Sequence, residues 1–276
     1  MKEESIALVK ELSDPSHKLN FLREYLQAFV LRSLHESEAF LNLSFVGGTA
    51  LRFLFSLLRF SEYLDFSLEV PNGYTPVKWM KKVERDLSLA GFAPTIEWND
   101  KEIVHTAWIR IAEILKEIGL TNLPEQKLSI KLEIDTKPPK GAKLKTLIIN
   151  RHMLFSLQHH DLASLMAGKV HALITRSYPK GRDWYDLVWY CTQSPPVSPN
   201  LELLQNALEQ SGKFIASKWR EDVCKQLDTV NTEELKSDVL PFLENPGEAR
   251  LLIDETIKSL LTTSQFSSYN SRLTLQ

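Results

Sequence analysis

Residues 45–70 read FVGGTALRFLFSLLRFSEYLDFSLEV, and this stretch decides the fold. Two adjacent glycines, from only ten in the chain, separate a short apolar strand from a helical run at residues 49–58. The alternating residues YLDFSLEV at 63–70 then predict a second strand. A lone acid, Asp65, lies in the middle of that strand, and Tyr63 stands two residues before it.

Composition narrows the class of protein. The chain has 276 residues, enough for one large domain or two ordinary ones, and 43% hydrophobic with 25% charged residues is typical of a soluble globular protein. No apolar run reaches the roughly 18 residues that span a bilayer, and the acidic start MKEESIALVKELSD is unlike a signal peptide. Cys191 and Cys224 lie too far apart in sequence to indicate a disulfide framework or a zinc ribbon. We therefore expect a cytoplasmic protein without a membrane segment.

The periodicity of the chain changes near its middle. Helices are predicted at residues 2–13, 18–36 and 76–90, and strands at 94–98, 103–113, 126–135 and 147–150. From Leu157 onward, segments with helical spacing follow one another, broken by turns that contain Pro or Gly. We expect His159 and His160 to lead into the first of these helices, with Asp161 as its N-cap. The sequence predicts an α+β fold, with a mixed α+β domain at residues 1–156 and a helical domain at 157–276. Residues 264–276 are polar, and we expect them to be loosely held.

The glycine pair has two interpretations. Two glycines between a strand and a helix let backbone N–H groups point outward at the positive end of the helix dipole, which suits a phosphate group. Close packing of the strand against the helix would require small residues at the same place. The pair by itself does not distinguish these alternatives.

Asp65 adds a second observation. It shares one strand face with Tyr63, and an acid in an apolar strand costs free energy unless a cation or a hydrogen-bond donor meets it. One partner would be a metal ion that carries the phosphates of a nucleotide; the alternative is a structural ion pair with Arg52 or Arg59. The strand at 126–135 presents two further acids on its polar face, Glu133 and Asp135. If the two strands are neighbours, a cluster of carboxylates forms beside the glycine turn.

Four segments of the chain resemble the motifs of one family. They are GGTALRFLF…RFSEYLDFSLE, DLASLMAGKVHALITR, KGRDWYDLVWY and DVLPFLENPGEA, in this order over roughly residues 40–250. Together they resemble the AbiEii-type nucleotidyltransferase toxins of the polymerase-beta-like superfamily. The resemblance implies a nucleotidyltransferase-like mixed β-sheet with flanking helices, followed by a helical bundle that completes the active site.

The resemblance also implies a role for individual residues. Gly47, Gly48 and Thr49 would hold the triphosphate of a nucleotide, and Asp65 would bind Mg²⁺ or Mn²⁺. Lys169 and Asp186 would act with Asp65 as catalytic residues. The remaining nucleotide-binding residues would be Arg59, Ser61, Arg176 and Asp183. A hydroxyl group would attack the α-phosphate, and pyrophosphate would leave. Without the resemblance, Asp186 has another reading, an ion pair with Arg182 one helical turn before it.

Tyr63 departs from the family pattern, because it occupies the place of the first acid in the Asp-x-Asp motif. Three residues are candidates to compensate as metal ligands, namely Glu69, Glu133 and Asp135. Alternatively, the site uses one firmly held metal ion. A further alternative is a catalytically silent member of the fold that binds nucleotide, RNA or a partner protein.

The sequence says least about the molecule that accepts the nucleotide. The net charge of −2 argues against overall attraction to nucleic acid, so binding needs a local patch. The stretch TKPPKGAKLKTLIINR lacks acids and contains Lys137, Lys140, Lys143 and Lys145, which are either an RNA-binding patch or solvated loop lysines. The resemblance implies RNA, in particular the 3′ end of tRNA, as acceptor and an antitoxin protein as partner. A protein side chain is a third acceptor class.

Overall fold

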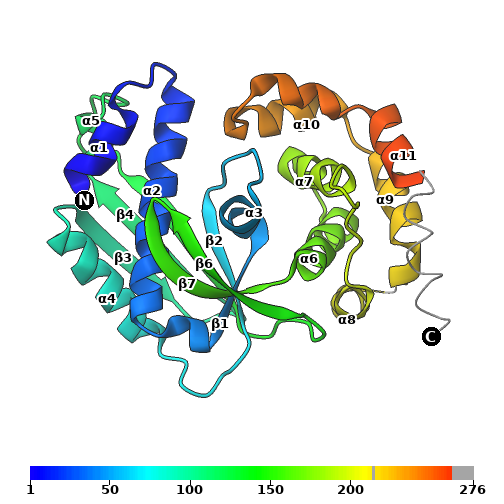
Figure 1. Cartoon of the computed structure of the whole chain (residues 1–276), viewed down its shortest axis with the longest axis horizontal. Coiled ribbons are helices and arrows are strands. Elements are labelled where there is room, and N and C mark those ends of the chain that lie inside the picture. The colour runs from blue at the N-terminus through cyan, green and yellow to red at the C-terminus, as the bar shows by residue number, and fades with distance from the viewer. Residues whose placement is uncertain (213–214, 263–276) are drawn as a thin grey trace. The chain divides into compact units, whose positions relative to one another are not determined.

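The computed structural model describes residues 1–212 and 215–262, and their strands form one seven-stranded mixed sheet in the order β3-β4-β5-β2-β1-β7-β6 (Figure 1). The strands are β1 Leu43–Val46, β2 Tyr63–Leu68, β3 Ala93–Asn99, β4 Val104–Ala112, β5 Leu128–Asp135, β6 Leu144–Arg151 and β7 Met153–His160. The predicted α+β class is confirmed. The tail at residues 264–276 lies outside the described residues.

The helices are distributed over both halves of the chain. Five lie in its first half: α1 Lys2–Lys10, α2 Pro15–Glu36, α3 Gly47–Phe55, α4 Pro76–Leu89 and the short α5 Ile114–Glu117. The others are α6 Leu162–Thr175, α7 Gly181–Cys191, α8 Leu201–Ser211, α9 Trp219–Leu227, α10 Thr232–Val239 and α11 Asp254–Thr262. Among the described residues, none of these helices has the length and apolarity needed to cross a bilayer.

The two faces of the sheet differ in chemistry, as alternation in the sequence predicts. Strands β2 and β5 run parallel as direct neighbours, and their apolar residues, such as Leu64, Phe66 and Leu132, are almost completely buried. Helix α2 contacts β5 from within the same unit, and α4 contacts β3. The polar residues between these apolar ones lie on the opposite, open face. The expectation that the strands carrying Asp65 and Glu133 are neighbours is thereby confirmed.

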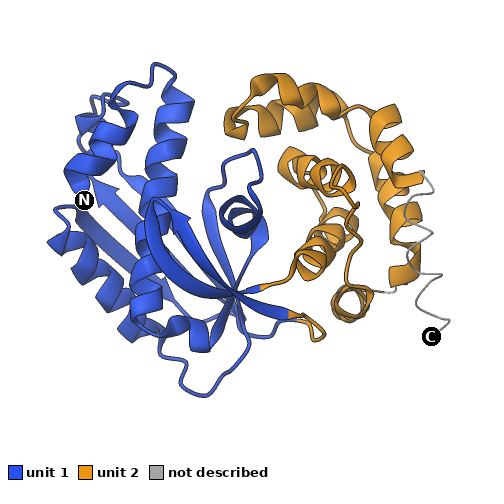
Figure 2. Ribbon diagram, viewed as in Figure 1, with its two compact units in different colours: residues 1–138, 144–159 blue, residues 139–143, 160–276 orange. Residues whose placement is uncertain are grey.

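Contact density divides the chain into two compact units, shown in blue and orange in Figure 2. Unit 1 contains residues 1–138 and 144–159, and unit 2 contains residues 139–143 and 160–276. The expected boundary at residues 156 and 157 falls inside strand β7. A division of the chain into two independent domains stays a prediction.

Strand β7 corrects one sequence interpretation. We expected His159 and His160 to lead into a helix, and the structure places both in the strand instead. Burial alternates along β7, but the strand ends in three polar residues, Gln158, His159 and His160, and joins α6 through Asp161 without a Gly or Pro turn, which hid the period of two. Asp161 is the predicted N-cap of α6, since its carboxylate accepts a hydrogen bond from the Ser164 N–H at 2.8 Å. The predicted short strand at 147–150 is the longer β6.

A buried ion-pair cluster ties the elements of unit 1 together. Glu24 of α2 is only 3% exposed and lies 2.5 Å from the Arg52 Nε of α3. Arg151 and His152, at the end of β6 and in the turn after it, both contact the other Glu24 oxygen at 2.9 Å. The Arg52 guanidinium also lies 4.3 Å from the centre of the Phe60 ring. This group, the Glu24 cluster, joins three segments that are distant in sequence.

Candidate functional site

Two side chains that pack against the turn explain the glycine pair at Gly47 and Gly48. Gly47 begins α3 with a φ of +79°, and a Cβ there would collide with the Asp65 carboxylate. A Cβ at Gly48 would collide with the Arg59 guanidinium, which is 1% exposed. Both positions therefore need glycine, because an acid and an arginine approach the backbone of the turn. Close packing and phosphate binding are thus compatible readings of one feature.

The other predicted residues around this turn have local partners. Arg59 donates to the Phe60 carbonyl at 2.9 Å, and the Ser61 carbonyl accepts from the Gln27 side chain at 3.0 Å. Thr49 is fully buried, and its hydroxyl donates to the Tyr63 carbonyl. The Thr49 side chain therefore ties α3 to β2, and the part of Thr49 suited to a phosphate is its backbone N–H at the start of the helix.

The acids on the open face are ordered by strand register. Asp65 lies directly beside Glu133, and Ser67 lies beside Asp135. The Lys131 ammonium is 2.6 Å from Glu133 Oε1, and Asp135 Oδ1 accepts the Lys137 N–H at 2.9 Å. Of the two acids on β5, Glu133 is thus the one placed next to Asp65.

Asp65 and Glu133 supply two neighbouring carboxylates. Among the described residues, no group of three or more His, Cys, Asp or Glu side chains is arranged to hold a metal. Mg²⁺ in nucleotide sites is commonly held by one or two carboxylates together with the substrate's phosphates, and Asp65 with Glu133 supplies that number. Glu69 lies four residues beyond Asp65, about 13 Å along a strand, which is too far to share an ion.

Tyr63 lies in the next row of the same face. It is in register with Lys131 on β5, whose ammonium lies 5.7 Å from the centre of the Tyr63 ring. The same ammonium lies 5.6 Å from the Trp108 ring on β4. At the position of Tyr63 this chain therefore has an aromatic ring beside a cation.

Unit 2 contains its own charged group, the Lys169 cluster. The Lys169 Nζ on α6 lies 2.9 Å from Asp183 Oδ1 and 2.8 Å from Asp186 Oδ2 on α7, and Arg176 pairs with Asp183. Asp186 is completely buried, whereas the Lys169 side chain is 14% exposed. The structure thus brings together all four of the residues predicted from the helical half.

Close packing holds α7 in its place within unit 2. A Cβ at Gly181 would run into the Leu235 carbonyl of α10, and the Gly181 N–H donates to Asp238 at 2.8 Å. Arg182 lies 4.3 Å from the Phe242 ring centre, while Asp186 binds Lys169. The orientation of α7 therefore points Asp183 and Asp186 toward α6.

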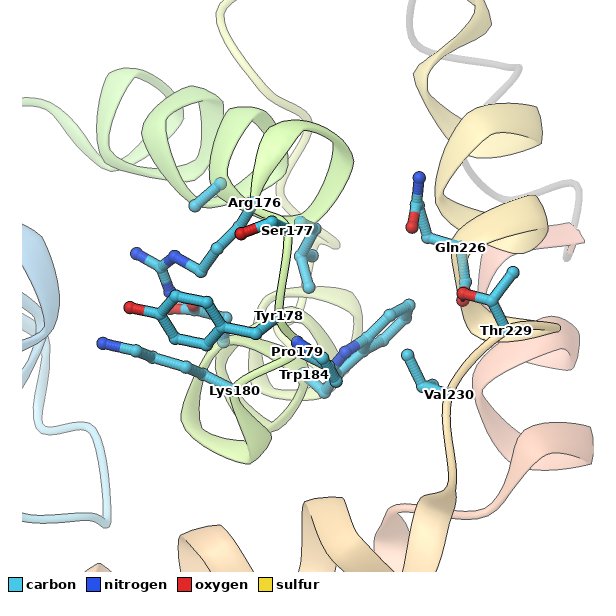
Figure 3. Close-up of a pocket in the computed structure, with 12 residues that line it drawn as sticks. Arg176, Ser177, Tyr178, Pro179, Lys180, Trp184, Gln226, Thr229 and Val230 are labelled. Carbon is cyan, nitrogen blue, oxygen red and sulfur yellow. The ribbon is translucent and has the colours of Figure 1, made fainter.

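A small pocket lies beside this cluster, entirely within unit 2 (Figure 3). Its volume is about 150 Å³, and sequence reasoning missed it because its walls come from separated segments. It is lined by Ala172, Leu173, Arg176, Ser177, Tyr178, Pro179, Lys180, Asp183, Trp184, Gln226, Thr229 and Val230. The one visible signal was the alternation of Arg176, Tyr178 and Lys180 in the connection between α6 and α7.

The four predicted patch lysines are all exposed. Lys145 is on strand β6, and Lys137, Lys140 and Lys143 are in the segment before it. This segment is anchored to helices of unit 2: Asn206 donates to the Lys140 carbonyl at 2.8 Å, and the Lys143 N–H donates to the Ser164 hydroxyl at 3.0 Å. The backbone of Lys140 and Lys143 is therefore held by contacts within unit 2, which the sequence did not reveal.

Comparison with known families agrees with this geometry. The profile described as "Nucleotidyl transferase AbiEii toxin, Type IV TA system" matches residues 29–261, which is most of the chain. The chain belongs to the AbiEii nucleotidyltransferase toxin family. AbiEii membership carries with it a nucleotide substrate, a divalent metal ion and an antitoxin partner. No curated protein sequence gives a significant match to this chain.

Two solved structures share the AbiEii-family fold seen here. A nucleotidyltransferase candidate from H. pylori superimposes with a TM-score of 0.56 and 17% identity, covering 93% of this chain and 97% of its own. The JHP933 protein from Helicobacter pylori gives a TM-score of 0.53 and 17% identity, covering 96% of this chain and 100% of its own. At this identity the two structures support the fold alone.

Proposed function

We propose that this AbiEii-family chain transfers a nucleoside monophosphate from a nucleoside triphosphate to an RNA acceptor, with the 3′ end of tRNA as the substrate. The observation that carries the proposal is the position of the Asp65 carboxylate. It lies against Gly47 at the first turn of α3 and in register with Glu133. An acid beside a helix N-terminus is suited to a metal-bound triphosphate, because the two groups bind the ion and the phosphates respectively.

In this proposal the turn at the start of α3 binds the phosphates, and the open face of the sheet binds the metal ion. Backbone N–H groups at Gly47, Gly48 and Thr49 bind phosphate oxygens, and Arg59 and Ser61 brace the segment that leads into β2. Asp65 and Glu133 hold Mg²⁺ or Mn²⁺, with Asp135 two residues further along β5. The ion, when bound, neutralises charge on the phosphates.

The residues of unit 2 complete the proposed site. Lys169 contacts the phosphates as a point charge, and Asp183 and Asp186 fix its position. Arg176 contributes a second cation. An acceptor hydroxyl attacks the α-phosphorus, the bond from that phosphorus to the oxygen bridging to the β-phosphate breaks, and pyrophosphate leaves. The hydroxyl proton is released to solvent. This scheme requires Asp65 and Lys169 to reach the same bound nucleotide.

A transfer assay tests the proposal. Purified protein is incubated with Mg²⁺, each labelled nucleoside triphosphate and total tRNA. We expect label on tRNA with at least one nucleotide, and loss of this label in Asp65→Ala and in Lys169→Ala. Glu97→Ala is the matched control, because Glu97 is an exposed acid on the same face of the sheet whose partner is Arg110. Equal labelling in the control and in Asp65→Ala would contradict the assignment of Asp65.

Tyr63 favours a second candidate function, that of a catalytically silent protein that binds nucleotide, RNA or its partner. In that case no label transfers to tRNA with any of the four nucleotides, although the protein binds them. The same assay with the antitoxin and other proteins added as acceptors tests transfer to a protein side chain. Label on protein and none on tRNA would replace RNA as the acceptor class.

The four exposed lysines at 137, 140, 143 and 145 form the proposed RNA-binding patch. Replacing all four with alanine should weaken tRNA binding and reduce its dependence on salt, because each phosphate contact releases counterions. Nucleotide binding should stay at the wild-type level. Unchanged tRNA affinity in the fourfold variant would show that these lysines are only solvated surface residues.

A further inference from the structure

The connection between α6 and α7 presents three hydrogen-bond donors side by side. Arg176, Tyr178 and Lys180 are alternate residues, and Figure 3 shows their side chains lying one over another with their polar tips pointing the same way. The Arg176 and Lys180 charges lie 6.0 and 5.5 Å from the centre of the Tyr178 ring. Tyr178 is 57% exposed. We call these three residues the donor row.

The pocket behind the donor row has a mixed lining. Leu173, Trp184 and Val230 give it apolar walls, and Gln226 and Thr229 of the segment around the end of α9 give it polar ones. Figure 3 shows Gln226 and Thr229 across the pocket from the donor row. The volume of about 150 Å³ is well below the 300–1,000 Å³ of pockets for drug-sized ligands. A flat fragment such as one nucleobase is therefore a better match than a whole nucleotide.

The charges that line the pocket indicate which kind of anion it can bind. Arg176 and Lys180 are accompanied there by one carboxylate, Asp183, which leaves one positive charge in excess. A phosphodiester carries one negative charge. A triphosphate carries several and is suited instead to a site with a metal ion.

We propose that the pocket and the donor row bind one unit of a single-stranded RNA. A base enters the pocket between Trp184 and Gln226, and its phosphodiester contacts Tyr178 and Lys180. The Gln226 amide donates to the Ile174 carbonyl and the Thr229 hydroxyl donates to the Gln226 carbonyl, so their side-chain oxygens serve as acceptors for an amino group at the edge of the base. A base also has a flat apolar face for the pocket walls. This inference rests on the proposed function only in taking that RNA to be the acceptor.

The test measures RNA binding separately from catalysis. A fluorescently labelled, unstructured oligoribonucleotide is titrated with the full-length protein while its anisotropy is recorded at several salt concentrations. Lys180→Ala should weaken binding about tenfold and lower the salt slope by about 0.7, the value for one phosphate contact of a single strand. Lys225→Ala is the matched control, because Lys225 is an exposed lysine of the same unit, on α9, that pairs with Asp222.

A second variant tests the pocket without removing charge. Thr229 is exposed at the rim, so Thr229→Trp should fill the pocket without disturbing the core and should weaken RNA binding by a similar factor. Binding of nucleoside triphosphate, measured by calorimetry, should be unchanged in Lys180→Ala and Thr229→Trp.

The possible outcomes separate this inference from the proposed function. Wild-type RNA affinity in both variants would overturn the inference, and so would loss of triphosphate binding in place of RNA binding. RNA binding that depends on Lys180 and Thr229, in a protein that transfers no nucleotide, would support the inference and refute the proposed function.

Discussion

The Glu24 cluster of unit 1 and the Lys169 cluster of unit 2 are both groups of acids and bases with buried carboxylates, and they differ in whether one ion pair is completely closed to solvent. Glu24 and Arg52 are both less than 4% exposed, while the other two basic side chains on Glu24, Arg151 and His152, are 30% and 15% exposed. In the Lys169 cluster, the acids are buried, but Lys169 is 14% and Arg176 is 32% exposed. A pocket opens beside it.

The difference separates two uses of buried charge. An ion pair such as Glu24–Arg52, in which neither charge reaches solvent, joins segments of the chain and is closed to a ligand. The Lys169 cluster has no such closed pair, and its Arg176 lines a pocket, where the cation is accessible to an anionic ligand. We therefore expect substitutions in the Glu24 cluster to change the free energy of unfolding, and substitutions in the Lys169 cluster to change activity.

The largest expected effect is that of Glu24→Ala. It leaves the Arg52 charge buried without its carboxylate, so it should lower the free energy of unfolding by about 3–5 kcal/mol. Urea denaturation measures this change. Glu125→Ala, at an exposed acid of the same unit, is the control and should stay within about 0.5 kcal/mol of wild type. Equal urea midpoints for the two variants would show that the Glu24 cluster contributes no stability.

The same cluster predicts a dependence of stability on pH. Burial by itself raises the pKa of Glu24, but the hydrogen bond from His152 and the charges of Arg52 and Arg151 outweigh it and lower the pKa from 4.5 to about 2. Because the folded pKa is below the unfolded one, the carboxylate stabilises the fold above pH 4.5, and this stability is lost as the pH falls toward 2. The loss should approach about 3 kcal/mol.

Urea midpoints measured between pH about 5 and about 2.5 check this window. Glu24→Gln has no ionisable group at this position, so its stability should fall less over the same range. Parallel curves for the variant and the wild type would assign the acid sensitivity to other carboxylates.

In the Lys169 cluster, Asp186→Asn should act mainly on catalysis. Asp183 still contacts Lys169 in this variant, so the fold should persist, but the Lys169 ammonium loses one of its two anionic contacts. A small displacement of a catalytic group can lower the rate about a hundredfold. Initial rates of label transfer, together with urea midpoints, measure both properties. A large loss of stability at unchanged activity would show that the Lys169 cluster serves the stability of the fold and not catalysis.

Two helical glycines, one in each unit, give the smallest expected effects. Gly48→Ala forces its new methyl group against the buried Arg59 guanidinium and should cost about 1–3 kcal/mol. Gly168→Ala, in the exposed interior of α6 with nothing near its Cβ, should stabilise by about 0.5–1 kcal/mol. The two unfolding midpoints should shift in opposite directions. A shift in the same direction would mean that Arg59 can move away from the turn.

The strands were predictable where burial alternates in a regular pattern. Leu128, Ile130, Leu132 and Ile134 are separated by polar residues, and this period of two identified β5 correctly. Strand β7 was missed because it ends in polar residues, Gln158 to His160, and no Gly or Pro separates it from α6. The α+β class survived that error, because it depends on the whole order of elements.

The site was predictable in parts. The glycine pair and Asp65 were identified from sequence, but the reason for the pair became visible only with Asp65 and Arg59 packed against it. Nothing local marks Glu24 as special, since Arg52, Arg151 and His152 lie between 28 and 128 residues away in sequence. The alternation of the donor row is visible in the sequence, but only the tertiary structure shows that these residues line a pocket.

The sequence by itself determined the α+β class, the order of the family motifs and the face of each strand that carries its acids. These features are local, because they follow from the spacing of apolar residues and from a few short motifs. The tertiary structure decided which of the two acids on β5 lies next to Asp65, what requires each glycine, and where a pocket forms. Those features depend on strand register and on contacts between distant segments, and no local pattern encodes them.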